Sequence, residues 1–267
     1  MLTTALSIAE EAAAIALEGF RRKPSVTKKG TIDLLTEYDL RSEALIRKRL
    51  ADAFPDHAIV GEEGDNEAID GRPVWYVDPI DGTTNFAHGH PFFCVSMALW
   101  VEGRGELGVV VAPALGVVWS AERGKGALRN GEPCRVSERS TLEDALCATG
   151  FPYDRFDDHE EDNLREHRAF LKRTRGIRRC GSAAIDLCSV ADGTYDLYWE
   201  QKLSPWDMCG GALIVEESGG RLSDYEGQKA DPREGRLVAS NGRLHDAALK
   251  VLAEARGVRR DPVGASR

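Results

Sequence analysis

The stretch Trp-Tyr-Val-Asp-Pro-Ile-Asp-Gly-Thr-Thr-Asn-Phe, residues 75–86, decides how this chain is organised. The apolar run at 74–77 predicts a buried strand, and Pro79 is expected to end it because proline has no amide hydrogen for a sheet ladder. Asp78 and Asp81 are therefore predicted where the strand ends. Carboxylate oxygens beside backbone amides suit Mg²⁺ and a phosphate group.

Further residues of this stretch support a ligand site. The Ile80 carbonyl can turn toward the two carboxylates, and Gly82 lets the backbone approach a ligand closely. Thr83 and Thr84 add hydroxyl and amide donors. The competing interpretation is a capped turn, in which the aspartates only accept hydrogen bonds from backbone amides.

The composition is that of a globular protein. The 267 residues fit one large or two small domains, and 42% of them are hydrophobic, which suffices for a sizeable core. No apolar run approaches the roughly 20 residues that cross a bilayer. The first 20 residues carry three glutamates and lack a basic start. We therefore expect a cytoplasmic protein with no signal peptide and no membrane partner.

Charge and cysteine content narrow the partners further. The net charge of −9 disfavours nucleic acid or an anionic membrane as the main partner. An anionic substrate remains compatible, since bound cations reverse the local sign of an acidic cluster. The six cysteines include no Cys-x-x-Cys pair and lie scattered through apolar stretches. They predict small buried thiols rather than disulfides or a zinc site.

The first half of the chain is predicted to form helices followed by a sheet. A helix over 3–20 and a turn or hairpin over 26–35, which could close over a site, come first. The spacing of Thr36 and Asp39 then caps a helix that ends before Pro55. A short strand at 58–61 delivers Glu62 and Glu63 to its end, and three antiparallel strands are expected between 92 and 126.

The second half, beyond a soft boundary near residue 140, alternates strand and helix. Its turn Gly181-Ser182-Ala183 opens a helix that ends near residue 191, where unpaired amides could bind an anion or a hydroxyl group. Asp207 starts another helix, as an N-terminal cap or as a metal ligand. Strands are predicted at 146–149, 177–180, 195–200, 221–224 and 237–240, helices also at 157–174, 208–217 and 244–255, and a frayed tail at 256–267.

Four acidic residues, Glu62, Asp78, Asp81 and Asp207, are each predicted at a strand end or a helix start. Such edges pair in a layered α/β fold, which lets these residues converge. Carboxylates brought within a few ångströms repel one another strongly unless cations lie between them. The pattern therefore predicts two or more Mg²⁺ ions rather than one general acid and one general base.

The motif that begins at Asp78 is preceded by Gly61-Glu62-Glu63 and followed by Pro205-Trp206-Asp207 with Gly219-Gly220. Together these motifs resemble the inositol monophosphatase family of magnesium-dependent, lithium-sensitive phosphomonoesterases, over about residues 5–255. The resemblance implies an alternating five-layer αβαβα sandwich. It also implies a single domain over 1–267, with lobes of about 1–140 and 141–267, and a homodimer.

The resemblance implies a metal role for each matching residue. Asp78 would bridge two ions, with Glu62 and the Ile80 carbonyl completing the protein ligands of the first. Asp81 and Asp207 would hold the second. The site would bind two to three Mg²⁺ in all.

The resemblance also implies the residues that act on water and substrate. Asp39 and Thr83 match the pair that orients and deprotonates the attacking water, and the amides of Gly82 and Thr83 would hold the phosphate. Glu200 and the turn at 181–183 fall where the family contacts substrate hydroxyls. The catalytic set is thus Asp39, Glu62, Asp78 and Thr83, and the substrate-binding set is Asp81, Gly82, Thr83, Gly181, Ser182, Ala183, Glu200 and Asp207.

The predicted function is hydrolysis of inositol 1-phosphate, or of a related small polyol phosphate, to the alcohol and phosphate. The same metal core serves histidinol-phosphate phosphatases, fructose-1,6-bisphosphatases and adenosine bisphosphate phosphatases in the family, and histidinol phosphatase is the first alternative. A regulatory or binding protein on the same fold is the non-enzymatic alternative, and the complete catalytic set argues against it. Nucleotide binding is weaker still, because no glycine-rich phosphate-loop motif is present.

Overall fold

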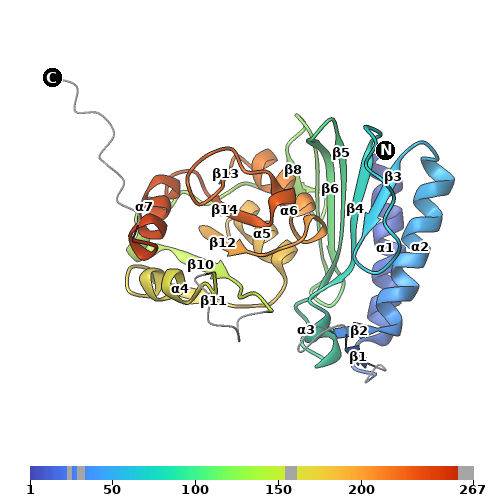
Figure 1. Ribbon diagram of the computed structural model, residues 1–267, viewed down its shortest axis with the longest axis horizontal. Coiled ribbons are helices and arrows are strands. Elements are labelled where there is room, and N and C mark those ends of the chain that lie inside the picture. The colour runs from blue at the N-terminus through green and yellow to red at the C-terminus, as the bar shows by residue number, and fades with distance from the viewer. Residues whose placement is uncertain (23–25, 29–33, 154–160, 258–267) are drawn as a thin grey trace.

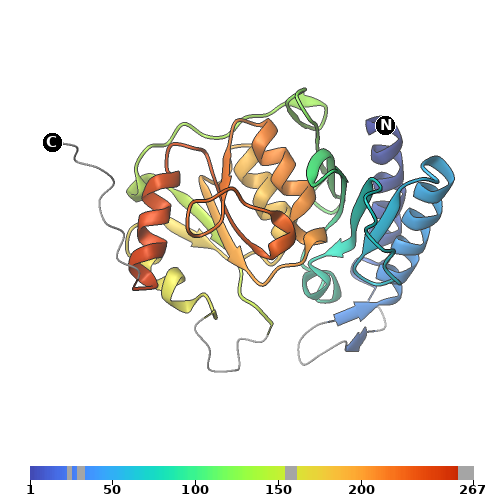
Figure 2. The same ribbon diagram turned by 45° about the horizontal axis from the view of Figure 1, so that its top comes forward.

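Helices and sheets alternate through this protein in five layers, helix, sheet, helix, sheet, helix (Figures 1 and 2). The computed structural model describes residues 1–22, 26–28, 34–153 and 161–257. The predicted five-layer αβαβα sandwich is confirmed. Within the described ranges, none of the helices has both the length and the apolar character needed to cross a membrane.

The first sheet has seven strands that lie in sequence order. Its first pair is parallel and the other pairs are antiparallel. Helices α1 (Leu2–Gly19) and α2 (Glu37–Ala53) cover its outer face (Figure 1). The strands are β3 Ala58–Gly61, β4 Val74–Asp81, β5 Cys94–Val101, β6 Arg104–Ala112, β7 Val117–Glu122, β8 Ala127–Arg129 and β9 Glu132–Pro133.

The second sheet has five strands in the order β11-β10-β12-β14-β13. Its first three strands are parallel, and β14 and β13 are antiparallel to their neighbours. Helices α4 (Leu164–Leu171) and α7 (His245–Ala255) cover its outer face. The strands are β10 Leu146–Thr149, β11 Gly176–Arg178, β12 Leu197–Gln201, β13 Arg221–Ser223 and β14 Arg236–Ser240, with short 3₁₀ helices at Leu142–Asp144 and Pro232–Glu234.

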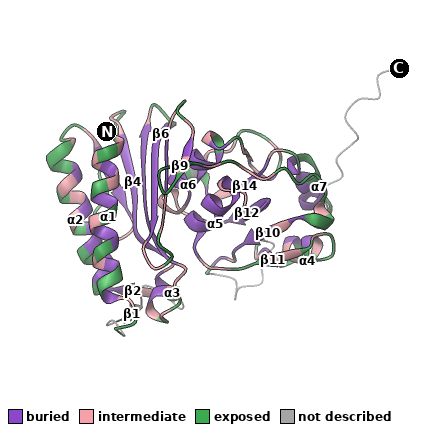
Figure 3. Ribbon diagram, turned by 180° about the vertical axis from the view of Figure 1, so that it is seen from behind, coloured by how far each residue is buried: buried purple, intermediate pink, exposed green. Residues whose placement is uncertain are grey.

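The three largest apolar cores join successive layers. The first joins α1 and α2 to the seven-stranded sheet, and the last joins α4 and α7 to the five-stranded sheet. The middle core contains α5 (Ala183–Ala191) and α6 (Pro205–Glu217), which lie between the sheets. Strand β12 faces two cores, because Leu197 and Trp199 point outward while Tyr198 points to the middle. Figure 3 accordingly shows the strands and inner helices as mainly buried.

Glycines let α6 pack very closely against its neighbours. A Cβ atom at Gly108 of β6 would lie 2.6 Å from the carbonyl oxygen of Gly210 on α6. A Cβ atom at Gly211 would lie 2.6 Å from the Cβ atom of Leu187 on α5. Helix α6 therefore touches the sheet backbone directly, with no side chain between them.

Strand β4 does not end at Pro79, so that prediction is wrong. The strand continues to Asp81, and three residue steps from Asp78 to Asp81 lie opposite two steps from Ser96 to Cys94 on β5. The extra residue makes a β-bulge, which accommodates a proline without a ladder hydrogen bond. The bulge moves the two aspartates to their positions at the sheet edge.

The helix predicted over 157–174 is shorter, because α4 spans only Leu164–Leu171. Asn163 precedes it with a left-handed φ of 66°, which no α-helix continues through. Residues 157–160 of the predicted helix, the tip of the predicted hairpin at 29–33 and residues 258–267 of the predicted tail lie outside the described residues. The stems of that hairpin, β1 (Val26–Lys28) and β2 (Leu34–Thr36), do pair as antiparallel strands.

Candidate metal centre and active site

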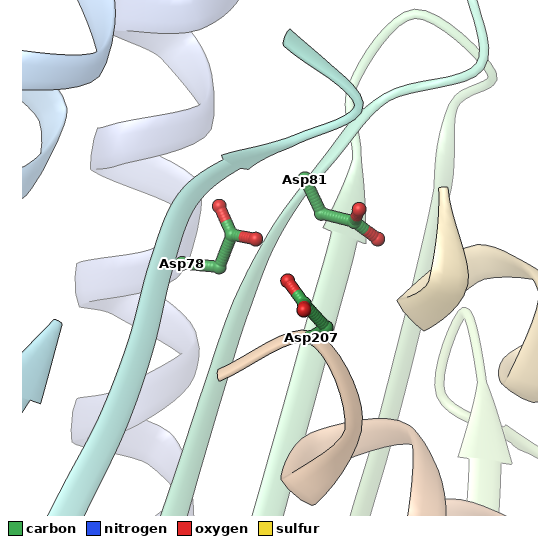
Figure 4. Close-up of side chains that lie close together, drawn as sticks. All are labelled: Asp78, Asp81 and Asp207. Atoms are coloured by element: carbon green, nitrogen blue, oxygen red, sulfur yellow. The ribbon is translucent and has the colours of Figure 1, made fainter. Parts of the chain in front are cut away.

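Three aspartates meet where the two sheets and α6 approach one another. Asp78 and Asp81 come from β4, and Asp207 comes from the first turn of α6 (Figure 4). Each offers one carboxylate oxygen, and these oxygens lie within 4.8 Å of one another. Residues far apart in the sequence thus form one acidic group, as predicted.

Local hydrogen bonds fix two of these side chains. The Ser182 hydroxyl and the Ala184 amide each donate to Asp81 Oδ2 at 2.7 Å, so Asp81 is joined to the start of α5. The Ser204 amide donates to Asp207 Oδ2 at 2.6 Å in a capping box. Asp207 therefore does cap its helix, and the same carboxylate also faces the aspartate group.

Electrostatics in this group favour protonation or bound cations. Burial, followed by the charges of Glu62, Asp81 and Asp207, raises the pKa of Asp78 well above its usual range. Burial raises the pKa of Asp81 to about 6, against the hydrogen bonds that it accepts. Among the described residues, no lysine or arginine forms an ion pair with the three aspartates. The group is a set of buried, hard oxygen donors, and such donors fit divalent cations such as Mg²⁺.

Glu62 lies beside the aspartates but outside their closest group. It lines the same pocket, and its charge contributes to raising the pKa values of Asp78, Asp81 and Asp207. Its loop is held by Glu43 of α2, whose carboxylate accepts the amide of Glu63 at 2.8 Å and the amide of Gly64 at 2.7 Å. Glu62 can therefore reach a cation that the aspartates hold.

Asp39 and Thr83 form the predicted pair. Thr83 Oγ1 lies 3.2 Å from Asp39 Oδ1 and 3.0 Å from the Ile80 carbonyl oxygen. Asp39 also closes the capping box of α2, because its Oδ2 accepts the Thr36 amide at 2.8 Å. Burial raises the pKa of Asp39 to about 6, against the hydrogen bonds from Thr36. Asp39 thus serves both as the cap and as the partner of Thr83.

Nearly all the predicted site residues line one pocket. It is lined by every residue of the predicted metal-binding and substrate-binding sets. Asp39 alone among the predicted residues does not line it and contacts Thr83 from behind. The pocket is also lined by Arg179, Trp206 and the segments 150–153 and 202–204.

The glycine turns of the pocket are held together by Asn85. Its Nδ2 atom lies within hydrogen-bond distance of the carbonyl oxygens of Phe92 (2.7 Å), Cys180 (2.8 Å) and Gly181 (3.2 Å). Gly82 adopts a φ of 94°, and a Cβ atom there would lie 3.0 Å from the carbonyl oxygens of Gly181 and Phe92. The two turns therefore approach so closely that only glycine fits.

Glu200 lies on the side of the pocket that the five-stranded sheet forms, opposite the seven-stranded sheet that carries Asp78 and Asp81. It lies on β12, is 9% exposed and accepts a hydrogen bond from the Tyr198 hydroxyl at 2.7 Å. Burial raises the pKa of Glu200 to about 7, although Tyr198 and Arg179 lower it. A carboxyl group in this position can accept or donate hydrogen bonds to hydroxyl groups.

Sequence reasoning missed Arg179 and Asn85. Arg179 lines the pocket and brings a positive charge toward Glu200. A basic residue two positions before the 181–183 turn was the available signal. Asn85 lies within the motif itself, and its side chain contacts become visible only when the 180–181 turn is placed. All six cysteines are free, as predicted, and four of them are buried.

Comparisons with known proteins agree with this geometry. The sequence profile of the inositol monophosphatase family matches residues 1–256. The Nus factor SuhB of Pseudomonas aeruginosa is 42% identical over 261 residues, covering 94% of this chain and 95% of that protein. Inositol monophosphatase 3 of Solanum lycopersicum is 41% identical over 259 residues, covering 95% and 96%. The solved IMPase of Thermotoga maritima has a TM-score of 0.87 at 37% identity, covering 95% of this chain and 97% of that chain.

Proposed function

Because this chain belongs to the inositol monophosphatase family, we propose that it is a magnesium-dependent phosphomonoesterase that hydrolyses inositol 1-phosphate or a related small polyol phosphate. The observation that carries the proposal is the group of three aspartates, of which Asp78 and Asp81 are buried and Asp207 is half-buried, with Glu62 beside it. The three aspartates form no ion pair with a lysine or arginine among the described residues. A second requirement, a polar end of the pocket for the alcohol, is met by Glu200.

The proposed metal ligands are Asp78 as the shared carboxylate, Glu62 with the Ile80 carbonyl on one side, and Asp81 with Asp207 on the other. Bound Mg²⁺ would supply the Lewis acidity that activates a water nucleophile and neutralises phosphoryl charge. The β-bulge after Asp78 and the start of α6 hold these carboxylates in place before any ion arrives.

Asp39 and Thr83 handle the proton of the attacking water in this proposal. Thr83 lines the pocket and can accept a hydrogen bond from the water while its hydroxyl hydrogen points to Asp39 Oδ1. The pKa of Asp39, about 6, allows the carboxylate to take up a proton near neutral pH. The nearby amides of Gly82 and Thr83 would orient the phosphate.

The alcohol end of the substrate would lie toward α5 and β12. There the 181–183 turn and Glu200 offer hydroxyl partners, as a polyol requires. The alternatives from the family, histidinol phosphate, fructose 1,6-bisphosphate and adenosine bisphosphate, differ at this end of the pocket. A homodimer is part of the proposal and can be checked by sedimentation velocity.

Phosphate release with Mg²⁺ tests the function. The panel contains inositol 1-phosphate, histidinol phosphate, fructose 1,6-bisphosphate and adenosine 3′,5′-bisphosphate. We expect the fastest release from inositol 1-phosphate and inhibition by Li⁺. Preference for another member would change the substrate and keep the reaction class. A folded, Mg²⁺-binding protein that releases no phosphate from any member would favour the non-catalytic alternative.

A further inference from the structure

We propose that Gly150 is a specificity-determining residue, because the absence of a side chain there gives the Glu200 carboxylate its place in the pocket. This inference rests on the proposed function, since it assumes that the hydroxyl groups of the substrate reach Glu200. It concerns a position to which neither the motifs nor the comparisons assign a role.

The space beside Gly150 is filled by the Glu200 carboxylate. A Cβ atom built on Gly150 would lie 2.0 Å from Oε1 of Glu200 and 2.2 Å from both Cδ and Oε2. These distances are far below the contact of two non-bonded atoms, roughly 3.5 Å. Even the methyl group of alanine therefore competes with the carboxylate for the same volume.

The backbone of Gly150 gives no other reason for glycine. Its φ lies outside the left-handed region, unlike that of Gly82 or Gly181 in the same pocket. Alanine is therefore compatible with the backbone at this position. The closest atoms that a side chain at this position would meet are those of the Glu200 carboxylate.

Residue 150 cannot easily move away from Glu200. Asn163 Nδ2 donates to the Gly150 carbonyl at 2.6 Å and to Thr149 Oγ1 at 2.8 Å, while Trp199 Nε1 donates to Asn163 Oδ1 at 2.8 Å. Asn163 is fully buried. These bonds join the end of β10 to β12 at the residue directly before Glu200.

The carboxylate is the movable part. The Tyr198 hydroxyl donates a hydrogen bond to its Oε2 atom. The Glu200 side chain can rotate about its own torsion angles, whereas the backbones of the paired strands cannot. A methyl group at position 150 would therefore rotate the carboxylate away from Tyr198. We expect Asp78, Asp81 and Asp207 to keep their places, because the three atoms nearest to the added methyl group all belong to Glu200.

Steady-state kinetics of Gly150→Ala test the proposal. Two substrates are compared, inositol 1-phosphate and p-nitrophenyl phosphate, whose leaving group carries no further hydroxyl groups. We expect the ratio of their kcat/KM values to fall about tenfold, the size of one lost charged hydrogen bond, mainly through KM for inositol 1-phosphate. The matched control is Gly176→Ala on β11, where a Cβ atom meets no atom closer than 3.4 Å and the ratio should not change.

A double-mutant cycle separates this inference from the proposed function. In Glu200→Ala protein the space is empty, so adding Gly150→Ala should cause no further loss of selectivity. The melting temperature should fall in Gly150→Ala and recover in the double variant, and this readout needs no substrate. Additive effects, or an unchanged selectivity in Gly150→Ala, would overturn the proposal. The wild-type protein could also hydrolyse neither substrate while the melting temperatures of the two single variants and the double variant are still non-additive. That result would overturn the proposed function and the specificity role, and it would still show that residue 150 contacts Glu200.

Discussion

Glu43 and Asp78 are both buried acidic residues, 2% and 1% exposed, but their surroundings are opposite. Arg47 donates to Glu43 at 2.7 Å, and the amides of Glu63 and Gly64 add two further hydrogen bonds. Asp78 accepts one hydrogen bond, from the Ile80 amide at 2.9 Å, and faces other carboxylates. One carboxylate is neutralised by the chain itself, and the other forms no ion pair with a lysine or arginine among the described residues.

The groups that surround a buried carboxylate distinguish a structural charge from one that belongs to a binding site. A carboxylate with a cation and amide donors stabilises the segment that supplies them. A carboxylate among other carboxylates destabilises the metal-free fold and gains from bound cations. The two are also connected, since Glu43 holds the 61–64 loop that carries Glu62 into the pocket.

The largest expected effect is that of Asp78→Asn. Asparagine keeps the acceptor for the Ile80 amide but removes the shared charge, so Mg²⁺-dependent turnover should fall by about 10³-fold or more. The metal-free variant should be more stable than the wild type by roughly 1 kcal/mol, because one repelling charge is gone. Phosphate release and urea unfolding in EDTA measure the two effects. A variant that is both active and less stable would break the comparison.

Glu43→Gln should act in the opposite direction on stability. It removes the charge that Arg47 and two loop amides neutralise, so we expect a loss of about 2 kcal/mol in the free energy of unfolding. The Mg²⁺ concentration for half-maximal activity should rise about tenfold, because the loop that carries Glu62 is less fixed. Activity at saturating Mg²⁺ should largely recover. An unchanged Mg²⁺ dependence would show that Glu43 is only structural.

The stability difference between metal-free wild type and Asp78→Asn should depend on pH. The folded pKa of Asp78, the group that the substitution removes, lies well above its usual 3.8, so its contribution to stability is full at low pH and is lost as pH rises. His245 acts oppositely, because burial lowers its pKa to about 4 and its contribution is lost as pH falls. His245 is common to both proteins and cancels in the difference. The variant's advantage in urea unfolding should therefore be larger at about pH 7.5 than at about pH 5, and an equal advantage at both would contradict the raised pKa values.

Arg47→Lys should have the smallest effect and sharpens the comparison. Lysine keeps the charge beside Glu43 but loses the fork that also reaches the Asp65 carbonyl at 3.1 Å and Asn66 Oδ1 at 3.3 Å. We expect a loss of about 1 kcal/mol or less and a smaller shift in Mg²⁺ dependence than in Glu43→Gln. A larger effect than that of Glu43→Gln would show that the arginine, rather than the Glu43 carboxylate, holds the loop that carries Glu62.

The aspartate group could be predicted from the sequence because each member follows a local signal. Asp78 and Asp81 end an apolar run, and Asp207 occupies a capping position, so their types and places are readable one at a time. The family resemblance then supplied Asp39, which alone would be only a helix cap. The five-layer order likewise came from the family resemblance.

Other features depend on contacts that no local pattern contains. The strand was wrongly predicted to end at Pro79. The bulge that accommodates this proline arises from the pairing of β4 with β5, which no local pattern contains. Asn163 lies inside a charged stretch that favours a helix, and its tertiary bonds to Thr149, Gly150 and Trp199 overrule that preference. No local pattern marks Glu43, because its loop partners, the amides of Glu63 and Gly64, are brought to it only by the fold.

The glycine contact between β6 and α6 has a consequence for how the site tolerates change. Gly108 and Gly210 set the separation of the sheet from the helix whose first turn carries Asp207. Added volume at Gly108 would push α6, and Asp207 with it, away from Asp78 without altering any carboxylate. The aspartate group is therefore sensitive to gains of volume at positions that have no side chain at all.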